Sequence, residues 1–192
     1  MKRFLLLLIL TAATTSIMAQ IANRIDLKHN GFVDAKDSTK NYIVLDYPKM
    51  SKVDLYKKTL TYLNSLYQNP AAVISAVDGE SITVNGMADN FKTKLYWWKY
   101  DYRYNITFQF KDGKIRFAPR FVSLMEDPDP SPKREIYLAN TDTGKEGEID
   151  CIFMLSKKEP KYFVFKDDLK SNLDKWANDY LVGIEAAIND KW

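Results

Sequence analysis

The fold is decided by the stretch YWWKYDYRYNITFQF, which covers residues Tyr96–Phe110. Every second residue in it, beginning with Tyr96, is aromatic or aliphatic, and most residues between them are polar. Because successive side chains of a strand point to opposite faces of a sheet, this alternation predicts a long strand with one buried face. Residues 111–114 (KDGK) predict a hairpin turn, and Ile115–Met125 predicts a returning strand. Pro119 within that second strand predicts an edge position or a bulge.

The residues before these two strands predict a strand, a helix and two more strands. Asn41–Tyr47 alternates between apolar and polar residues and predicts the first strand. Ser51 is the expected N-cap of a helix that ends near Gln68. Its apolar stripe at helical spacing consists of Val53, Tyr56, Leu60, Leu63 and Tyr67. Ala72–Val77 and Ser81–Ala88 predict two short strands joined by a turn.

The residues after these strands divide into an ambiguous segment and a final helix. Segment 127–166 holds three short apolar runs that fit either strands or turns, and we treat it as an irregular insertion. These runs are Ile136–Ala139, Ile149–Leu155 and Tyr162–Phe165. A long helix is predicted from about Asp168 to Asn189. Its apolar stripe consists of Leu169, Leu173, Trp176, Ala177, Tyr180, Leu181, Ile184 and Ile188.

These elements predict an α+β fold in the order β-α-β-β-β-β-α. An antiparallel sheet with both helices on one face satisfies the strand alternation and the helical stripes together, because each element then buries one side. The 192 residues suffice for one domain of ordinary size. We therefore expect a single domain over 41–192, preceded by a polar lead-in over 20–40 with little structure of its own.

Residues 1–19 have the pattern of a secretory signal peptide. Lys2 and Arg3 precede the apolar run Phe4–Leu10, and the expected cleavage lies between Ala19 and Gln20. The apolar run is far shorter than the roughly 20 residues that span a bilayer, although an uncleaved anchor or a buried helix is the alternative. We therefore expect an exported protein, in the periplasm or at the cell surface, with no membrane span after cleavage.

The charge and the residue inventory exclude several kinds of chemistry. Cleavage would change 28 basic and 25 acidic residues to 26 and 25, too balanced for nucleic-acid binding. One Cys and one His exclude a disulfide framework and a Cys/His zinc site. Cys151 has apolar neighbours and is expected to be buried, whereas His29 lies in the polar lead-in and is expected to be solvated. No phosphate-binding glycine loop is present, so we expect no cofactor, and of hydrolytic mechanisms only carboxylate-pair chemistry remains.

Several of these segments resemble a known family when they are taken in order. The segments are Tyr42–Pro48, Ser51–Tyr56, Asn69-Pro70 and Ile82–Gly86. They resemble a secreted family of unknown function from Gram-negative bacteria that has a TATA-binding-protein-like fold. The resemblance covers roughly 32–125 and the final helix, and segment 127–166 departs from it. It implies the β-α-β-β-β-β-α fold but no activity and no catalytic residues, because a fold does not fix a function.

The aromatic cluster at 96–104 is the expected binding region. Fifteen residues of strand would extend about 50 Å, so this end either bends or projects beyond the core. Projecting aromatic rings suit sugar rings or a partner protein, whereas the alternative is that most of these rings form core. The candidate ligand-binding residues are Tyr96, Trp97, Lys99 and Tyr100.

We therefore predict an exported, non-catalytic binding or interaction module of the cell envelope. An envelope protein or a glycan is the expected partner. The alternative function is carbohydrate or envelope-polymer binding through the cluster at 96–104, and a carboxylate-dependent hydrolase is a further alternative.

Overall fold

The computed structural model describes residues 24–92, 99–127, 135–140, 151–156 and 161–190. The helices are α2 (Lys52–Leu66), α3 (Pro70–Val73) and α4 (Asp167–Asn189). The strands are β1 (Ile25–Lys28), β2 (Gly31–Asp34), β3 (Ile43–Asp46), β4 (Ile74–Val77), β5 (Ser81–Lys92), β6 (Lys99–Lys111), β7 (Lys114–Asp127), β8 (Glu135–Asn140), β9 (Cys151–Leu155) and β10 (Tyr162–Val164).

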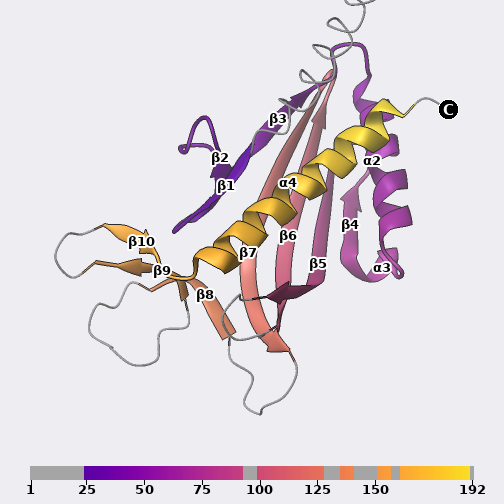
Figure 1. Cartoon of the computed structure of the whole chain (residues 1–192). Helices are drawn as coiled ribbons and strands as arrows, with labels where there is room; N and C mark the ends of the chain where they lie inside the picture. Colours follow the sequence, from indigo (N-terminus) through magenta and orange to yellow (C-terminus); the bar gives the residue numbers. More distant parts are fainter. Residues whose placement is uncertain (1–23, 93–98, 128–134, 141–150, 157–160, 191–192) are drawn as a thin grey trace, which may run out of the picture.

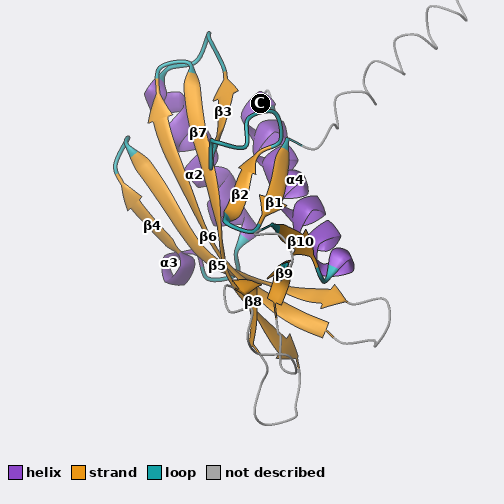
Figure 2. Cartoon of the chain, turned by 90° about the vertical axis from the view of Figure 1, so that its left-hand side faces the viewer, coloured by secondary structure: helices purple, strands orange, loops and turns teal. Residues whose placement is uncertain are grey.

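The strands form one large sheet and one separate hairpin. The large sheet has the order β10-β9-β8-β7-β6-β5-β4, and β3 pairs with β7 beside this path. Neighbouring strands are antiparallel except β8 and β9, which are parallel. Helices α2 and α4 lie on the same side of the sheet, and α4 crosses it diagonally (Figures 1 and 2). The predicted α+β class is confirmed, and β3-α2-β4-β5-β6-β7 followed by α4 contains the predicted order with further strands added.

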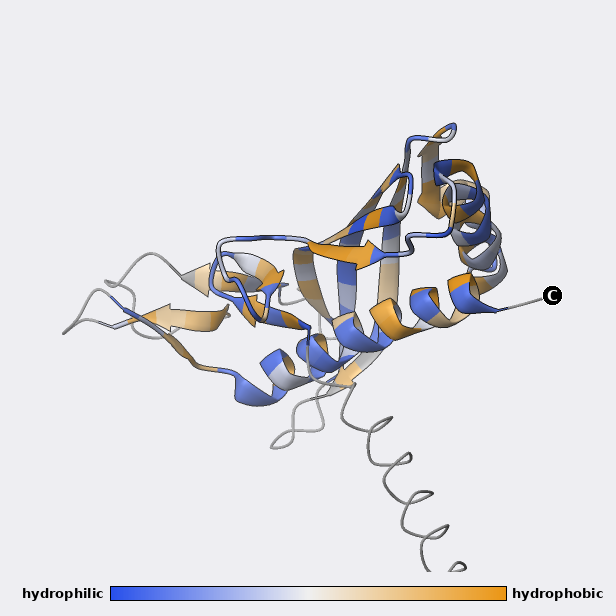
Figure 3. Cartoon of the chain, turned by 90° about the horizontal axis from the view of Figure 1, so that it is seen from above, coloured by the Kyte–Doolittle hydropathy of each residue, from blue (hydrophilic) through white to orange (hydrophobic). Residues whose placement is uncertain are grey.

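Strand β6 has the predicted alternation along its whole length. The buried residues at every second position are Tyr100, Tyr102, Tyr104, Ile106, Phe108 and Phe110. Figure 3 shows this pattern as alternating orange and blue bands along the long strands. The predicted hairpin turn follows β6, and Gly113 has a φ of 71°, which glycine adopts without a steric penalty. The covered face of the sheet is therefore a continuous aromatic and aliphatic core.

Pro119 lies at a local edge of β7, and the bulge in this strand is close by rather than at Pro119 itself. Strand β7 pairs with β3 over 114–117 and with β8 at 124–125, so Pro119 lies between the two partners. The register between β6 and β7 also shifts between Arg103 and Tyr104, which marks a bulge close to Pro119. Proline has no backbone N–H to donate. Pro119 lies at a point where one side of β7 has no paired strand among the described residues.

Helix α2 begins as predicted, and most of its predicted stripe faces the core: Tyr56 and Leu63 are buried, and Leu60 and Tyr67 pack against the core. Ser51 Oγ accepts a hydrogen bond from the backbone N–H of Asp54 at 3.1 Å, which is the expected N-cap. Val53, predicted as part of the stripe, is 50% exposed, whereas Leu55 is buried. The helix contacts α4 as well as β6 and β7. In α4, by contrast, every residue of the predicted stripe is buried or packed against the core.

The prediction of a polar lead-in is wrong for 25–34, which form the β1–β2 hairpin. Leu27 and Phe32 are buried in the main core. Asn178 on α4 accepts hydrogen bonds from the backbone N–H groups of Arg24 (2.8 Å) and Ile25 (3.1 Å) through Oδ1. The hairpin is therefore stabilised by a helix more than 140 residues away in the chain. Its strands have only four residues each, which is too short to show a period in the sequence. His29, in the turn between β1 and β2, is exposed. Its ring stacks on the ring of Tyr162, with 4.2 Å between the two centroids.

The prediction of an irregular insertion is also wrong where the segment is described. Strand β8 extends the sheet from β7, β9 pairs with β8, and β10 pairs with β9. Cys151, Ile152 and Phe153 of β9 are buried, which confirms the expected burial of the cysteine. Each of these strands forms its hydrogen bonds with a neighbouring strand. A single short apolar run does not show which segment that neighbour is.

Candidate functional site

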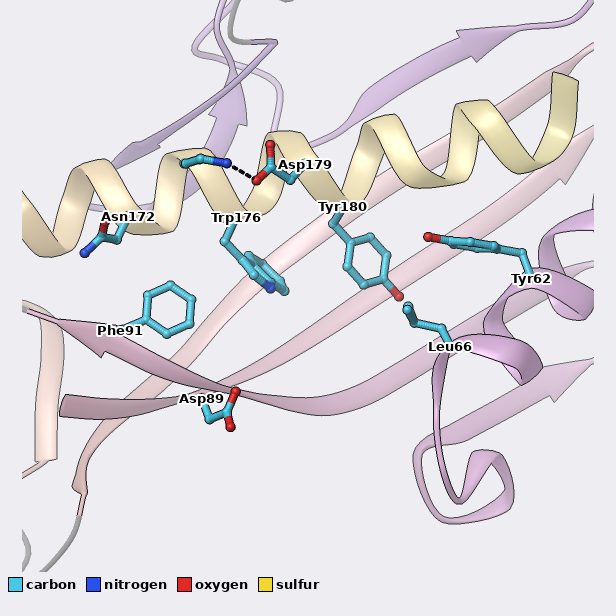
Figure 4. Close-up of a pocket in the computed structure, with 9 residues that line it drawn as sticks. Tyr62, Leu66, Asp89, Phe91, Asn172, Trp176, Asp179 and Tyr180 are labelled. Atoms are coloured by element: carbon cyan, nitrogen blue, oxygen red, sulfur yellow. Dashed lines mark hydrogen bonds and ion pairs between the residues drawn. The ribbon is translucent and has the colours of Figure 1, made fainter. Parts of the chain in front are cut away.

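A groove opens between α4, the end of α2 and the end of β5. Its volume is about 660 Å³. Aromatic rings and polar groups line it in similar numbers, and Figure 4 shows them arranged along the space between α4 and β5. The lining residues are Tyr62, Leu66, Asp89, Phe91, Asn172, Lys175, Trp176, Asp179 and Tyr180.

Helical spacing places three of these side chains together. Asn172, Trp176 and Tyr180 follow one another at four-residue intervals on α4, which puts them on one side of the helix. This side borders the buried stripe, so Trp176 and Tyr180 are half-buried and contact the core with part of their surface. The groove therefore exposes parts of rings whose positions are fixed by the fold.

Two glycines allow tyrosine rings to come close to the backbone beside the groove. A Cβ atom on Gly86 of β5 would lie 2.3 Å from Cζ of Tyr104. A Cβ atom on Gly183 of α4 would lie 2.4 Å from the hydroxyl oxygen of Tyr62. The absence of a side chain at Gly86 leaves room for the ring of Tyr104, and at Gly183 it leaves room for the hydroxyl end of Tyr62, which also lines the groove.

A bulge in β5 lies where the strand borders the groove. Ala88 is opposite Tyr102, but Phe91 rather than the next alternate residue is opposite Tyr100. The extra residue in β5 changes which side chains point to each face, and bulges commonly redirect a side chain in this way. Asp89, within the bulge, is exposed and lines the groove together with the largely buried Phe91.

Three tyrosine hydroxyls form a chain of hydrogen bonds below the groove. The hydroxyl oxygen of Tyr67 lies 3.0 Å from that of Tyr104 and 2.8 Å from that of Tyr180. Trp176 packs on the same cluster, with its ring centroid 4.9 Å from that of Tyr102 and 4.6 Å from that of Tyr104. Ring packing and hydrogen bonds together hold the groove-facing rings in place.

Burial raises the pKa of Tyr67, Tyr104 and Tyr180 well above the usual value for tyrosine. Loss of water disfavours the charged phenolate, and the hydroxyl of Tyr67 further raises the pKa of Tyr104. These three hydroxyls are therefore protonated at neutral pH. They can donate and accept hydrogen bonds, but they cannot serve as bases under those conditions.

The charged groups of the groove lie at its rim. Lys175 and Asp179, one turn apart on α4, form an ion pair, and their side chains are 73% and 61% exposed. The charges of this pair cancel, so Asp89 leaves the lining with a net charge of one negative unit. The site thus combines an apolar, aromatic floor with a polar and almost neutral rim.

The predicted binding residues have different outcomes. Tyr96 and Trp97 lie outside the described residues, as do Ala19 and Gln20 at the expected cleavage site. Lys99 is exposed at the start of β6. Tyr100 is only 2% exposed and belongs to the core, so the expectation that this end of the strand projects from the sheet is wrong at Tyr100. Its ring is buried because it continues the alternation of β6 and lies opposite Phe91.

Sequence reasoning missed most of the groove. It assigned Trp176 and Tyr180 to the helical stripe, but it singled out none of Tyr62, Asn172 and Asp89. The spacing of Asn172, Trp176 and Tyr180 along the border of the stripe was the available signal. Tyr62 and Asp89 come from other elements, and only the packing of these elements brings them to α4.

Two features are absent from the residues that the structure describes. No group of three or more His, Cys, Asp or Glu residues there could hold a metal ion. No helix within the described ranges has the length and apolar character needed to cross a bilayer.

Comparison with known proteins supports the fold. No protein-family model and no curated protein matches the sequence. The structure is similar to the crystal structure of a TBP-like protein from Parabacteroides distasonis, with a TM-score of 0.56 and 9% sequence identity, over 79% of this chain and 92% of that one. A DUF4468 family protein from Bacteroides ovatus has a TM-score of 0.49 and 12% identity, over 78% of this chain and 85% of that one. The chain therefore has a TBP-like α+β fold, as its sequence predicted, and this likeness concerns the fold alone.

Proposed function

We propose that this protein is an exported, non-catalytic binding module of the cell envelope that holds a neutral sugar unit in the groove between α4, α2 and β5. The observation that carries the proposal is the groove itself, in which parts of fixed aromatic rings stand beside polar groups. The leader pattern at 1–19 supports export.

A sugar ring matches the chemistry of this groove. It has C–H faces that pack against aromatic rings and hydroxyls at its edges that exchange hydrogen bonds with amides, carboxylates and phenols. Trp176 and Tyr180 supply ring surface, and Asn172 and Asp89 supply polar groups nearby (Figure 4). The nearly neutral rim favours an uncharged ligand over an ionic one.

The open face of the sheet gives less support to an apolar protein contact. Its most exposed apolar residues include Met87 on β5 and Val122 on β7. Arg103 on β6 lies between these two strands and is directly opposite Met87, so the apolar side chains do not join into one patch there. Specific docking through apolar surface needs a contiguous patch.

The groove also gives little support to carboxylate-pair hydrolysis. Such chemistry depends on two carboxyl groups whose surroundings push their pKa values apart, usually in an apolar pocket. Asp179 is ion-paired with Lys175 and largely exposed to solvent, and Asp89 is exposed as well. We therefore propose a binding function rather than a hydrolytic one.

The test is a thermal-shift titration of the exported protein with glucose, N-acetylglucosamine and their β-1,4-linked tetramers. A ligand at 100 times its Kd adds about 2.7 kcal/mol to the free energy of unfolding. For a chain of this size we expect Tm to rise by about 5–10 °C with at least one of these sugars. The intact mass of the same sample reports whether residues 1–19 have been removed.

Two variants locate the binding. Asn172→Ala removes a polar group from the groove, and we expect it to weaken sugar binding about tenfold, which corresponds to about 1.4 kcal/mol. Gln109→Ala lies on the open face and is expected to bind the sugar as the wild type does. The proposal fails if none of the sugars raises Tm, or if both variants bind equally well.

A further inference from the structure

A second recess lies on the open face of the sheet, away from the sugar groove. It has a volume of about 720 Å³ and lies at the end of the sheet where β6 turns into β7, next to the start of α2. Its lining is rich in basic residues and carries fewer acidic ones. The lining residues are Tyr42, Val44, Lys52, Glu80, Gln109, Phe110, Lys111, Asp112, Lys114 and Arg116.

Arg116 is held in place by neutral partners. Its guanidinium carbon lies 3.8 Å from the centroid of the Tyr42 ring, a stacked cation–π contact. Its Nη1 donates a hydrogen bond to Oε1 of Gln109, which is directly opposite on β6, at 3.3 Å. Both contacts orient the planar group without cancelling its charge. A guanidinium oriented in this way can hold a carboxylate or a phosphate through two parallel hydrogen bonds.

Two lysines at the hairpin turn add to this positive charge. Lys111 and Lys114 face each other across β6 and β7, an arrangement in which like charges repel. Lys114 has a long, exposed ion pair with Asp46, with 3.5 Å between Nζ and Oδ1. Exposed pairs of this kind contribute at most about 1 kcal/mol, so a bound anion can compete for the lysine.

The acidic groups of the recess are partly engaged elsewhere. Oδ1 of Asp112 accepts a hydrogen bond from the backbone N–H of Lys52 at 2.8 Å. Glu80 lies 3.8 Å from Lys52 Nζ and is 69% exposed. The lining contains four basic side chains and two acidic ones, so its net charge is positive.

The recess also offers apolar surface beside this charge. Val44 is 41% exposed and is paired directly with Arg116 across β3 and β7. The Tyr42 ring lies under the guanidinium of Arg116. A ligand that fits both features carries one oxyanion and a ring or a short carbon skeleton.

We propose that this recess binds a small organic anion, a carboxylate- or phosphate-bearing sugar or a compound of similar size, with Arg116 as the residue that holds the oxyanion. Lys111 and Lys114 complete the positive surroundings, and Val44 with Tyr42 contacts the carbon skeleton. The site is separate from the sugar groove and does not depend on the function proposed for it.

The test measures binding of glucuronate, glucose 6-phosphate, inorganic phosphate and glucose to the full exported protein by isothermal titration calorimetry. We expect saturable binding of at least one of the two charged sugars and none of glucose at this site. Binding of glucuronate alone identifies a carboxylate ligand, and binding of glucose 6-phosphate with inorganic phosphate as competitor identifies a phosphate ligand. Added salt is expected to weaken the binding, because exposed charges are screened.

Matched variants assign the site. Arg116→Gln is expected to lower the affinity at least about tenfold, since a charge-assisted bidentate contact is lost. Arg103→Gln removes the same charge from the same face of the sheet, outside the recess, and is expected to leave the affinity unchanged. Lys111→Gln, in the exposed turn, provides a second test that does not disturb the Tyr42 stack, with an expected loss of a few-fold.

Three results would overturn the proposal. These are the absence of saturable binding of either charged sugar, equal affinities of Arg116→Gln and the wild type, and equal losses in Arg116→Gln and Arg103→Gln. Glucose binding that Asn172→Ala weakens would belong to the sugar groove. Because different variants report on the two sites, one proposal can fail while the other holds.

Discussion

The two faces of strand β6 differ in almost every respect, although the same thirteen residues form both. The covered face is packed with aromatic and aliphatic side chains under α2 and α4. The open face carries polar and charged residues, namely Asp101, Arg103, Asn105, Thr107 and Gln109. Most of the stability must come from the covered face, because burial of apolar surface is the main stabilising contribution. The open face is therefore free to carry charges that recognise a ligand.

The two proposed sites differ in the same way. The sugar groove uses rings that also belong to the core, such as Trp176 and Tyr180. The anion recess uses Arg116 and Gln109, which stand on the open face and support no part of the core. Substitutions in the groove can therefore change folding as well as binding, whereas substitutions in the recess should change binding alone.

Adjacent residues of β6 should give the largest contrast. Phe108 is fully buried, and Phe108→Ala is expected to lower the free energy of unfolding by about 4 kcal/mol. Gln109→Ala, one residue further on the open face, is expected to change it by no more than about 0.5 kcal/mol. Urea unfolding of both variants measures the difference. Similar losses in the two variants would show that the faces do not divide stability as described.

Alanine substitutions at two glycines with similarly short contacts should change the free energy of unfolding by different amounts. Gly86→Ala is expected to cost about 3 kcal/mol, because its Cβ would meet the ring of Tyr104, which other rings and a hydrogen bond hold in place. Gly183→Ala meets only the hydroxyl end of Tyr62, which can rotate away, and alanine favours the helix by about 1 kcal/mol. We expect the stability of Gly183→Ala to lie within about 1 kcal/mol of the wild type, as measured by thermal unfolding. Equal losses would mean that Tyr62 is held as firmly as Tyr104.

Alkaline pH should lower stability through the buried tyrosines of the covered face. Burial raises the pKa of Tyr67, Tyr104 and Tyr180 above the value of about 10 in the unfolded chain, so the unfolded state loses protons first as the pH rises. Stability is therefore full below about pH 10 and decreases above it. Tyr67→Phe should make this decrease less steep.

Thermal unfolding of the wild type and Tyr67→Phe from about pH 8 to 11 tests this linkage. A wild-type Tm that does not change with pH above 10 would contradict the burial of these hydroxyls.

The long elements could be predicted from the sequence because each carries many repeats of its own period. Strand β6 and helix α4 present one buried face over their whole length, and local spacing is enough to identify them. The hairpin at 25–34 and the strands β8 to β10 could not be predicted, since each of the strands concerned has six residues or fewer. Their structure depends on partners such as Asn178 and β7, which are distant in the chain.

The sequence by itself determined the α+β class, the aromatic face of the central strand, the turn after it and the two long helices. These features follow from local periodicity and capping, which act over a few residues. Only the tertiary structure decided where the two proposed binding surfaces lie. The groove joins Tyr62, Asp89 and Trp176 from three elements, and the recess joins Tyr42, just before β3, to Arg116 of β7. Contacts between residues so far apart arise from packing and register, and the spacing of neighbouring residues carries no record of them.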